Sequence, residues 1–283
     1  MNKSKNKPLV SFDWAMKRLL RSKANFGILE GFLSELLKED LKIDCLLESE
    51  SNQKSQQDKF NRVDMLVKNS KGELIIIEVQ VEDEVDYLQR IYYGVAKAVT
   101  EYIEKGSKYK AVKKVISVSI LYFDLGQGQD YIYQGRTNFI GMHKKDELLL
   151  SEKQKKEFRK DKIHEIFPEY YLIKVNQFDD LAKNTLDEWI YFLKNEQIKK
   201  KFTAKGLQEA NEKLQVLKLP AEKRQEYQTH LEALHDKASF YLSTFVQGKR
   251  EGISEGIQRG KQEILKKLVQ QGIMTQQEAD NYE

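Results

Sequence analysis

The chain has 283 residues, enough for one large domain with an appendage or for two modest domains, so it can bury a substantial core. Its single cysteine, Cys45, excludes an internal disulfide and a cysteine-rich metal site, which favours a reducing compartment. The 48 basic and 44 acidic residues leave a net charge of +4, which permits binding to a polyanion without requiring it.

The chain begins with a polar, lysine-rich segment, and we expect residues 1–10 to form a disordered basic tail. No apolar run of signal-peptide length follows this tail, and no later run reaches the length that spans a membrane. We therefore expect a cytoplasmic protein without a membrane partner.

Helical and strand patterns intermix over the first 200 residues. Residues 12–40 have helical spacing with a break at 22–25, and three strand candidates follow, with a polar loop over 53–59 between the first two: 43–48, 60–69 and 73–81. Helical spacing returns over 86–106, and later elements are predicted at 112–122, 131–138, 170–176 and, as a helix, 186–193. This order predicts an α/β (α+β) domain over residues 11–200, with a mixed sheet flanked by helices.

Beyond residue 200 only helical spacing remains, and we expect an all-helical C-terminal region over 201–283. Within it Gly248, Gly252, Gly256 and Gly260 recur every four residues, which places them near one helical face. The repeat indicates either a close approach of helices or flexibility.

The strands 60–69 and 73–81 form a hairpin whose register follows from their side chains. A three-residue loop over 70–72 pairs Asp64 with Glu78, whereas a two-residue loop pairs Asp64 with Ile77 and mixes apolar and polar residues on both faces. We adopt the first register, in which Gly72 takes the left-handed conformation. Its other pairs are Val67 with Ile75, Met65 with Ile77, Val63 with Val79, Leu66 with Ile76, and Arg62 with Gln80.

In this register Asp64, Glu78 and Gln80 share one face. Directly opposed side chains have Cβ atoms roughly 4.5 to 5.5 Å apart, so the two carboxylates repel each other and a divalent cation relieves the repulsion. Magnesium prefers such hard oxygen ligands, and a bound magnesium ion suits phosphodiester hydrolysis. The alternative is a solvated strand end whose acids pair with a lysine or Arg62. Against it, the aliphatic run before Glu78 indicates a central strand, where an unpaired charge costs several kcal/mol.

An aspartate ending one strand, a hairpin, and the segment Ile76-Ile77-Glu78-Val79-Gln80 together resemble the PD-(D/E)xK nuclease superfamily. Within it the chain looks most like the Rpn family of recombination-promoting nucleases, also described as transposase-like. The resemblance covers about residues 11–200 and includes 12–17, 25–37, Arg90 and Tyr93, and the glycine repeat is typical of that family.

The resemblance implies a restriction-endonuclease-like core and a DNA endonuclease that uses Mg²⁺, or Mn²⁺ as a substitute, in recombination or transposition. Asp64 and Glu78 would be the metal ligands. Gln80 stands where the wider superfamily has a lysine, and a neutral amide only forms hydrogen bonds, although the Rpn family itself typically carries glutamine. Two rivals therefore stay open: a weak or inactive DNA-binding or interaction protein derived from a mobile element, and a structural protein with salt-bridged acids.

Further candidate residues lie on the predicted helices. Gln89 and Tyr93 are four residues apart on one helix face, a spacing that resembles a DNA-positioning feature of the superfamily. The alternative is an aromatic core helix in which Arg90 binds a neighbouring carboxylate instead of phosphate or the metal-ligand shell. The first core helix offers two candidates for an additional acid of the site, of which Glu30 is preferred to Glu35. The alternative for both is an ordinary position on a solvated helix flank.

Cleavage of both strands of a duplex needs two sites, so we expect a homodimer that forms through the C-terminal helices.

Overall fold

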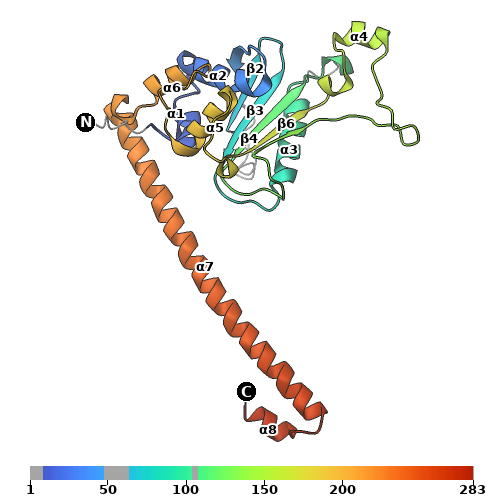
Figure 1. Cartoon of the computed structure of the whole chain (residues 1–283), viewed down its shortest axis with the longest axis vertical. Helices are drawn as coiled ribbons and strands as arrows, with labels where there is room; N and C mark the ends of the chain where they lie inside the picture. The colour runs from blue at the N-terminus through green and yellow to red at the C-terminus, as the bar shows by residue number, and fades with distance from the viewer. Residues whose placement is uncertain (1–8, 48–63, 104–107, 283) are drawn as a thin grey trace. The chain divides into compact units, whose positions relative to one another are not determined.

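The structure is a computed structural model that describes residues 9–47, 64–103 and 108–282 (Figure 1). Several predictions therefore fall outside the described residues. These are most of the predicted tail, the polar loop 53–59, and the pairs of Arg62 with Gln80 and Val63 with Val79. The chain divides into two compact units, Met1–Pro220 and Ala221–Glu283. The predicted domain boundary near residue 200 stays a prediction.

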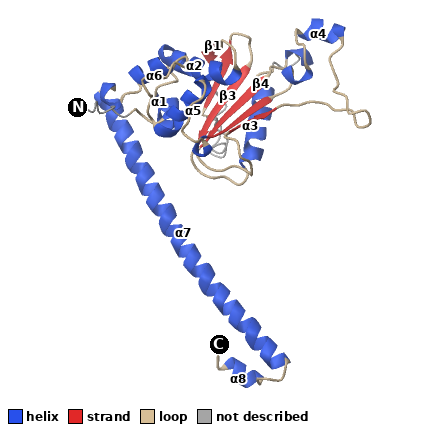
Figure 2. Cartoon of the chain, viewed as in Figure 1, coloured by secondary structure: helices blue, strands red, loops and turns tan. Residues whose placement is uncertain are grey.

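A six-stranded mixed sheet forms the centre of the first unit (Figure 2). Its strands lie in the order β1-β2-β3-β4-β6-β5, with bounds Ile43–Leu46, Met65–Asn69, Leu74–Gln80, Val115–Leu121, Glu169–Lys174 and Ile132–Gly135 respectively. Strands β3, β4 and β6 are parallel, whereas β1, β2 and β5 pair antiparallel with their neighbours. The aliphatic runs of β3 and β4 are buried on both faces, as expected for central parallel strands.

Helices cover both faces of this sheet, with α3 on one face and α1, α2 and α5 on the other (Figure 1). Phe12 of α1 packs edge-to-face against Phe32 of α2 at a ring distance of 6.0 Å and against Trp189 of α5 at 6.5 Å. These aromatic contacts join the three helices into one layer. The helices of this unit are α1 (Phe12–Arg18), α2 (Phe26–Leu37), α3 (Tyr87–Glu101), α4 (Glu152–Phe158), α5 (Thr185–Asn195) and α6 (Leu207–Lys213).

Helical spacing places Leu88, Ile91, Tyr92, Val95, Val99, Tyr102 and Ile103 on one side of α3. Of these, Ile91 and Val95 are buried, and Val99 and Tyr102 pack, partly buried, against apolar side chains of β2, β3 and β4. Leu88 and Tyr92 are exposed instead, and the buried face of the helix also includes Tyr87 and Ala98. The face that meets the sheet is thus rotated slightly from the predicted one.

The second unit consists of α7 (Ala221–Gln270), a helix of 50 residues, and the short α8 (Gln276–Asp280). All four repeat glycines lie inside α7, and a Cβ atom at any of them would meet no described atom within 4 Å. Within the described ranges, no helix combines the length and the apolar character that a membrane span requires. The predicted fold class, a mixed sheet flanked by helices and followed by a helical region, is confirmed.

Candidate active site

The hairpin of β2 and β3 adopts the register predicted from its side chains. Met65 pairs with Ile77, Leu66 with Ile76 and Val67 with Ile75. The loop closes with a hydrogen bond from the amide of Gly72 to the carbonyl of Asn69 at 2.9 Å, and Gly72 has a φ of 76°. Continued by one residue beyond the pair of Met65 and Ile77, this register sets Asp64 opposite Glu78.

Asp64 lies immediately before β2, and its side chain is fixed against β3. The carboxylate Oδ2 accepts a hydrogen bond from the backbone amide of Val79 at 2.8 Å. Burial raises the pKa of Asp64, although the Val79 amide and the nearby charge of Lys17 oppose this change. The aspartate therefore occupies a defined position next to the strand that carries Glu78 and Gln80.

Glu78 is only 8% exposed although it is a carboxylate on a central strand. Its Oε2 accepts a hydrogen bond from the buried hydroxyl of Tyr87 at 3.2 Å, at the start of α3. Burial raises the pKa of Glu78, the positive charge of Arg90 opposes the rise, and the neighbouring charge of Asp64 adds to it. Two carboxylates thus share a poorly solvated corner of the sheet.

Glu84 joins Gln80 to Arg90 beside this corner. The amide nitrogen of Gln80 donates to Glu84 Oε1 at 3.0 Å and to the carbonyl of Glu82 at 3.1 Å. Arg90 Nη1 donates to both oxygens of Glu84, at 2.7 and 2.9 Å. Arg90 therefore binds a neighbouring carboxylate, and its charge still acts on Glu78. Glu84 is not among the residues predicted from the sequence, where it is one acid in the loop between β3 and α3.

Helix α1 and the turn after it bring a third carboxylate and two cations to Asp64, and none of these three residues was predicted as a site residue. Lys17 Nζ lies 2.6 Å from Asp13 Oδ1 and 3.9 Å from Asp64 Oδ1. Arg21 donates to the backbone carbonyl of Asp64 at 3.2 Å. The available signal was the i,i+4 spacing of Asp13 and Lys17, which ordinarily indicates a surface ion pair.

The remaining predicted residues do not join the carboxylate pair. Glu30 accepts hydrogen bonds from Lys42 Nζ and from the amide of Ile43, both at 2.9 Å, and so connects α2 to β1. Glu35 accepts a hydrogen bond from Thr185 at 2.5 Å. Neither acid therefore lies on a solvated flank without a partner, and neither has a hydrogen bond to Asp64 or Glu78.

Gln89 and Tyr93 are exposed on α3, and Tyr93 is 51% accessible to solvent. Tyr93 is therefore not part of an aromatic core. The two side chains lie one turn apart on the exposed face of α3, and the opposite face of this helix covers the sheet.

The carboxylate pair suits a magnesium ion. Over the described ranges, no group of three or more His, Cys, Asp or Glu side chains is arranged to hold a metal. Magnesium, however, keeps several waters and is commonly held by only one or two protein carboxylates. Asp64 and Glu78 supply two hard oxygen donors, and the burial that raises both pKa values is offset when a cation neutralises them.

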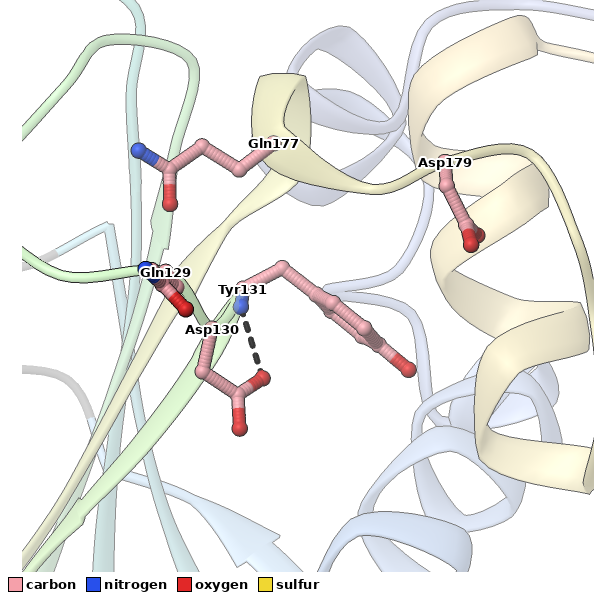
Figure 3. A pocket seen from close by; sticks show the side chains of 5 residues that line it. All are labelled: Gln129, Asp130, Tyr131, Gln177 and Asp179. Carbon is pink, nitrogen blue, oxygen red and sulfur yellow. Dashed lines mark hydrogen bonds between the residues drawn. The ribbon is translucent and has the colours of Figure 1, made fainter.

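A separate pocket of about 360 Å³ lies between the segments before β5 and after β6, lined by Gln129, Asp130, Tyr131, Gln177 and Asp179 (Figure 3). Asp130 Oδ1 accepts a hydrogen bond from the amide of Tyr131 at 2.7 Å, so this carboxylate organises its own turn. None of the candidate site residues lines this pocket.

A model of the family described as PD-(D/E)XK nuclease family transposase matches residues 10–243. The matched region contains the whole sheet, the carboxylate pair and α1, which confirms the resemblance to this superfamily and to transposases. Comparisons with curated proteins and with solved structures found no significant match.

Proposed function

The chain belongs to the PD-(D/E)XK nuclease family transposases, and from this premise we propose that it is a metal-dependent DNA endonuclease that hydrolyses phosphodiester bonds in recombination or transposition. The observation that carries the proposal is the attachment of Asp64 to the Val79 amide beside the buried Glu78. A structural protein needs no such pair of adjacent, poorly solvated carboxylates, because their repulsion costs stability.

Asp64 and Glu78 are the proposed ligands of Mg²⁺, with Mn²⁺ as a substitute. A bound ion of this kind polarises a phosphoryl oxygen and makes a coordinated water more acidic. The protein holds each ligand in place, since the Val79 amide binds Asp64 and the Tyr87 hydroxyl binds Glu78. Both contacts stabilise the charged form of the carboxylate, which is the form that binds a cation.

DNA is the proposed substrate, and the exposed Gln89 and Tyr93 are proposed to contact it. They lie on α3, two and six residues after Tyr87, which contacts Glu78. An exposed amide and an exposed phenol can bind phosphate oxygens and sugar hydroxyls. These residues would hold the backbone of the nucleic acid along the outward face of α3, the helix that begins beside Glu78.

A second candidate function is DNA binding with weak or absent cleavage. The amide nitrogen of Gln80 is already occupied by Glu82 and Glu84, and Arg90 is paired with Glu84. Neither side chain is presented to a substrate in this arrangement. The third position of the site therefore supplies no free positive charge, which favours a low rate.

We also propose that the protein forms a dimer through α7. Apolar side chains remain exposed along this helix, including Leu242, Phe245, Val246, Ile253, Ile257 and Ile264. Four glycines inside one helix each cost about 1 kcal/mol relative to alanine, so packing against another helix must stabilise it. In an antiparallel pair centred on Gly256, Lys249 lies near the glycine face and faces the partner's Glu263.

Incubation of the full chain with supercoiled plasmid, with and without Mg²⁺ or Mn²⁺, tests the nuclease proposal. We expect nicked or linear DNA only with the metal, and no product from Asp64→Ala or Glu78→Ala. Asp44→Asn is the matched control, because Asp44 forms an ion pair with Lys68 at the far side of β2. Bound but intact DNA under every metal tested would favour the second candidate function.

A further inference from the structure

The cations around the carboxylate pair differ in how strongly the protein already binds them. Arg90 uses Nη1 for both oxygens of Glu84. Arg21 donates to a backbone carbonyl rather than to a carboxylate. Among the described residues, only Lys17 forms an ion pair with Asp64 or Glu78, and its 3.9 Å distance to Asp64 is too long for a hydrogen bond.

Lys17 also has donors and space left for a ligand. An ammonium group carries three N–H donors, and its 2.6 Å ion pair with Asp13 lacks hydrogen-bond geometry, since Asp13 Oδ1 has no hydrogen-bond partner among the described residues. The side chain of Lys17 is 46% exposed, whereas that of Asp13 is only 12% exposed. The carboxylate of Asp13 is therefore held in place by burial, and the side chain of Lys17 stays partly open to solvent.

The helix that carries both residues is held rigidly against the core. Phe12 packs against three aromatic rings of α2 and α5, and Met16 is fully buried. Asp13 and Lys17 lie one turn apart on this short helix, so both side chains point in similar directions. The position of the ammonium group beside Asp64 is thus set by packing that does not depend on the hairpin.

We propose that Lys17, positioned by Asp13, is the cation that contacts the scissile phosphate, a role that the neutral Gln80 cannot fill. The proposal rests on the proposed nuclease function. Water forms the new bond to phosphorus, the bond to the leaving sugar oxygen breaks, and a proton from the water reaches that oxygen through solvent. Lys17 takes no part in the proton transfer, and its part is to offset the negative charge that develops on the phosphoryl oxygens.

The test removes the lysine at residue 17 and, in a second variant, also introduces a lysine at residue 80. Single-turnover cleavage of a labelled duplex is measured with saturating Mg²⁺ for the full chain, Lys17→Met, Lys17→Arg, and the double variant Lys17→Met with Gln80→Lys. We expect Lys17→Met to cut about 100-fold more slowly, which is the effect of losing one charge-stabilising group. Lys17→Arg should keep most of the rate of the parent. The double variant with Gln80→Lys should cut at least about tenfold faster than Lys17→Met alone.

Lys68→Met is the matched control, since Lys68 forms a comparable ion pair with Asp44 at 3.1 Å and should cut like the parent. Cleavage by Lys17→Met within about threefold of the parent would overturn the inference, because one lost charge contact is worth far more. A loss that Gln80→Lys does not restore would also overturn it, since Lys17 would then serve folding alone. If the parent itself cuts no DNA while Asp64→Ala behaves identically, the nuclease proposal fails, and this inference fails with it.

Discussion

The Oδ2 atom of Asp64 lies 2.8 Å from the backbone nitrogen of Val79, the residue between Glu78 and Gln80. One side chain thus holds the start of β2 against the strand that carries the other two proposed site residues. The same contact gives Asp64 a structural role in addition to its proposed role as a metal ligand. The two roles can be separated by substitution.

We expect Asp64→Asn to keep the fold and lose cleavage. The asparagine oxygen can still accept the Val79 hydrogen bond, but the negative charge that would bind the metal is gone. Asp64→Ala should lose cleavage and, in addition, about 1 kcal/mol or more of stability, because the Val79 amide loses its acceptor. Thermal unfolding of both variants without metal checks this difference. Equal stability of the two variants would contradict the structural role.

Glu169 should make the first unit sensitive to acid. Burial opposes ionisation of this carboxyl, but hydrogen bonds from Lys114, Tyr171 and Arg136 outweigh it and lower the pKa of Glu169 to about 2. A carboxyl whose folded pKa lies below its unfolded value of 4.5 stabilises the fold above that value. This stabilisation is lost as the pH falls from about 4.5 to about 2.

The pH dependence can be assigned by substitution. Glu169→Gln should unfold more easily than the parent at neutral pH, and the difference between them should shrink as the pH falls through that range. Denaturant unfolding followed by tryptophan fluorescence at several pH values measures the difference. A gap that stays constant down to pH 2 would show that Glu169 does not carry the effect.

The hairpin part of the site could be predicted because its information is local. The apolar alternation of the strands that form β2 and β3 admits one register, and that register alone sets Asp64 opposite Glu78. The position of Gly72 in the loop agrees with it, with a left-handed φ of 76°. Pattern and turn chemistry thus give the same answer for adjacent strands.

The contributions of the helices could not be predicted, because they depend on how distant elements pack. Helical spacing places Glu30 on a border of the apolar face of α2 but does not say which strand that border meets. In the structure it meets the start of β1, whereas Asp13 and Lys17 of α1 reach Asp64. An i,i+4 pair of opposite charges is common on helix surfaces, so the sequence alone does not distinguish this pair.

We expect Gly31→Ala to destabilise the first unit by about 1 to 3 kcal/mol. A Cβ at Gly31 would lie 2.3 Å from the backbone carbonyl oxygen of Lys205, which packs across α2 and cannot rotate away. Gly27→Ala is the matched control on the same helix, since its Cβ would meet the flexible end of Glu209. That variant should be neutral or gain up to about 1 kcal/mol from helix propensity. Chemical unfolding of both variants gives the comparison, and equal destabilisation would contradict the tight contact.

The proposed antiparallel dimer of α7 makes a specific expectation about charge. Lys249→Glu would place a glutamate opposite the partner's Glu263 twice per dimer, and two lost pairs with added repulsion should weaken self-association about tenfold or more. Adding Glu263→Lys restores opposite charges at both places, so the double variant should associate like the parent. In a parallel pair each residue would face its own copy, and the second substitution would restore nothing.

Sedimentation velocity over a range of concentrations distinguishes these outcomes, and a chain that ends near Phe245 should be monomeric throughout. An unchanged mass for that shortened chain would remove α7 as the interface, because the glycines and the charged pairs all lie beyond that residue.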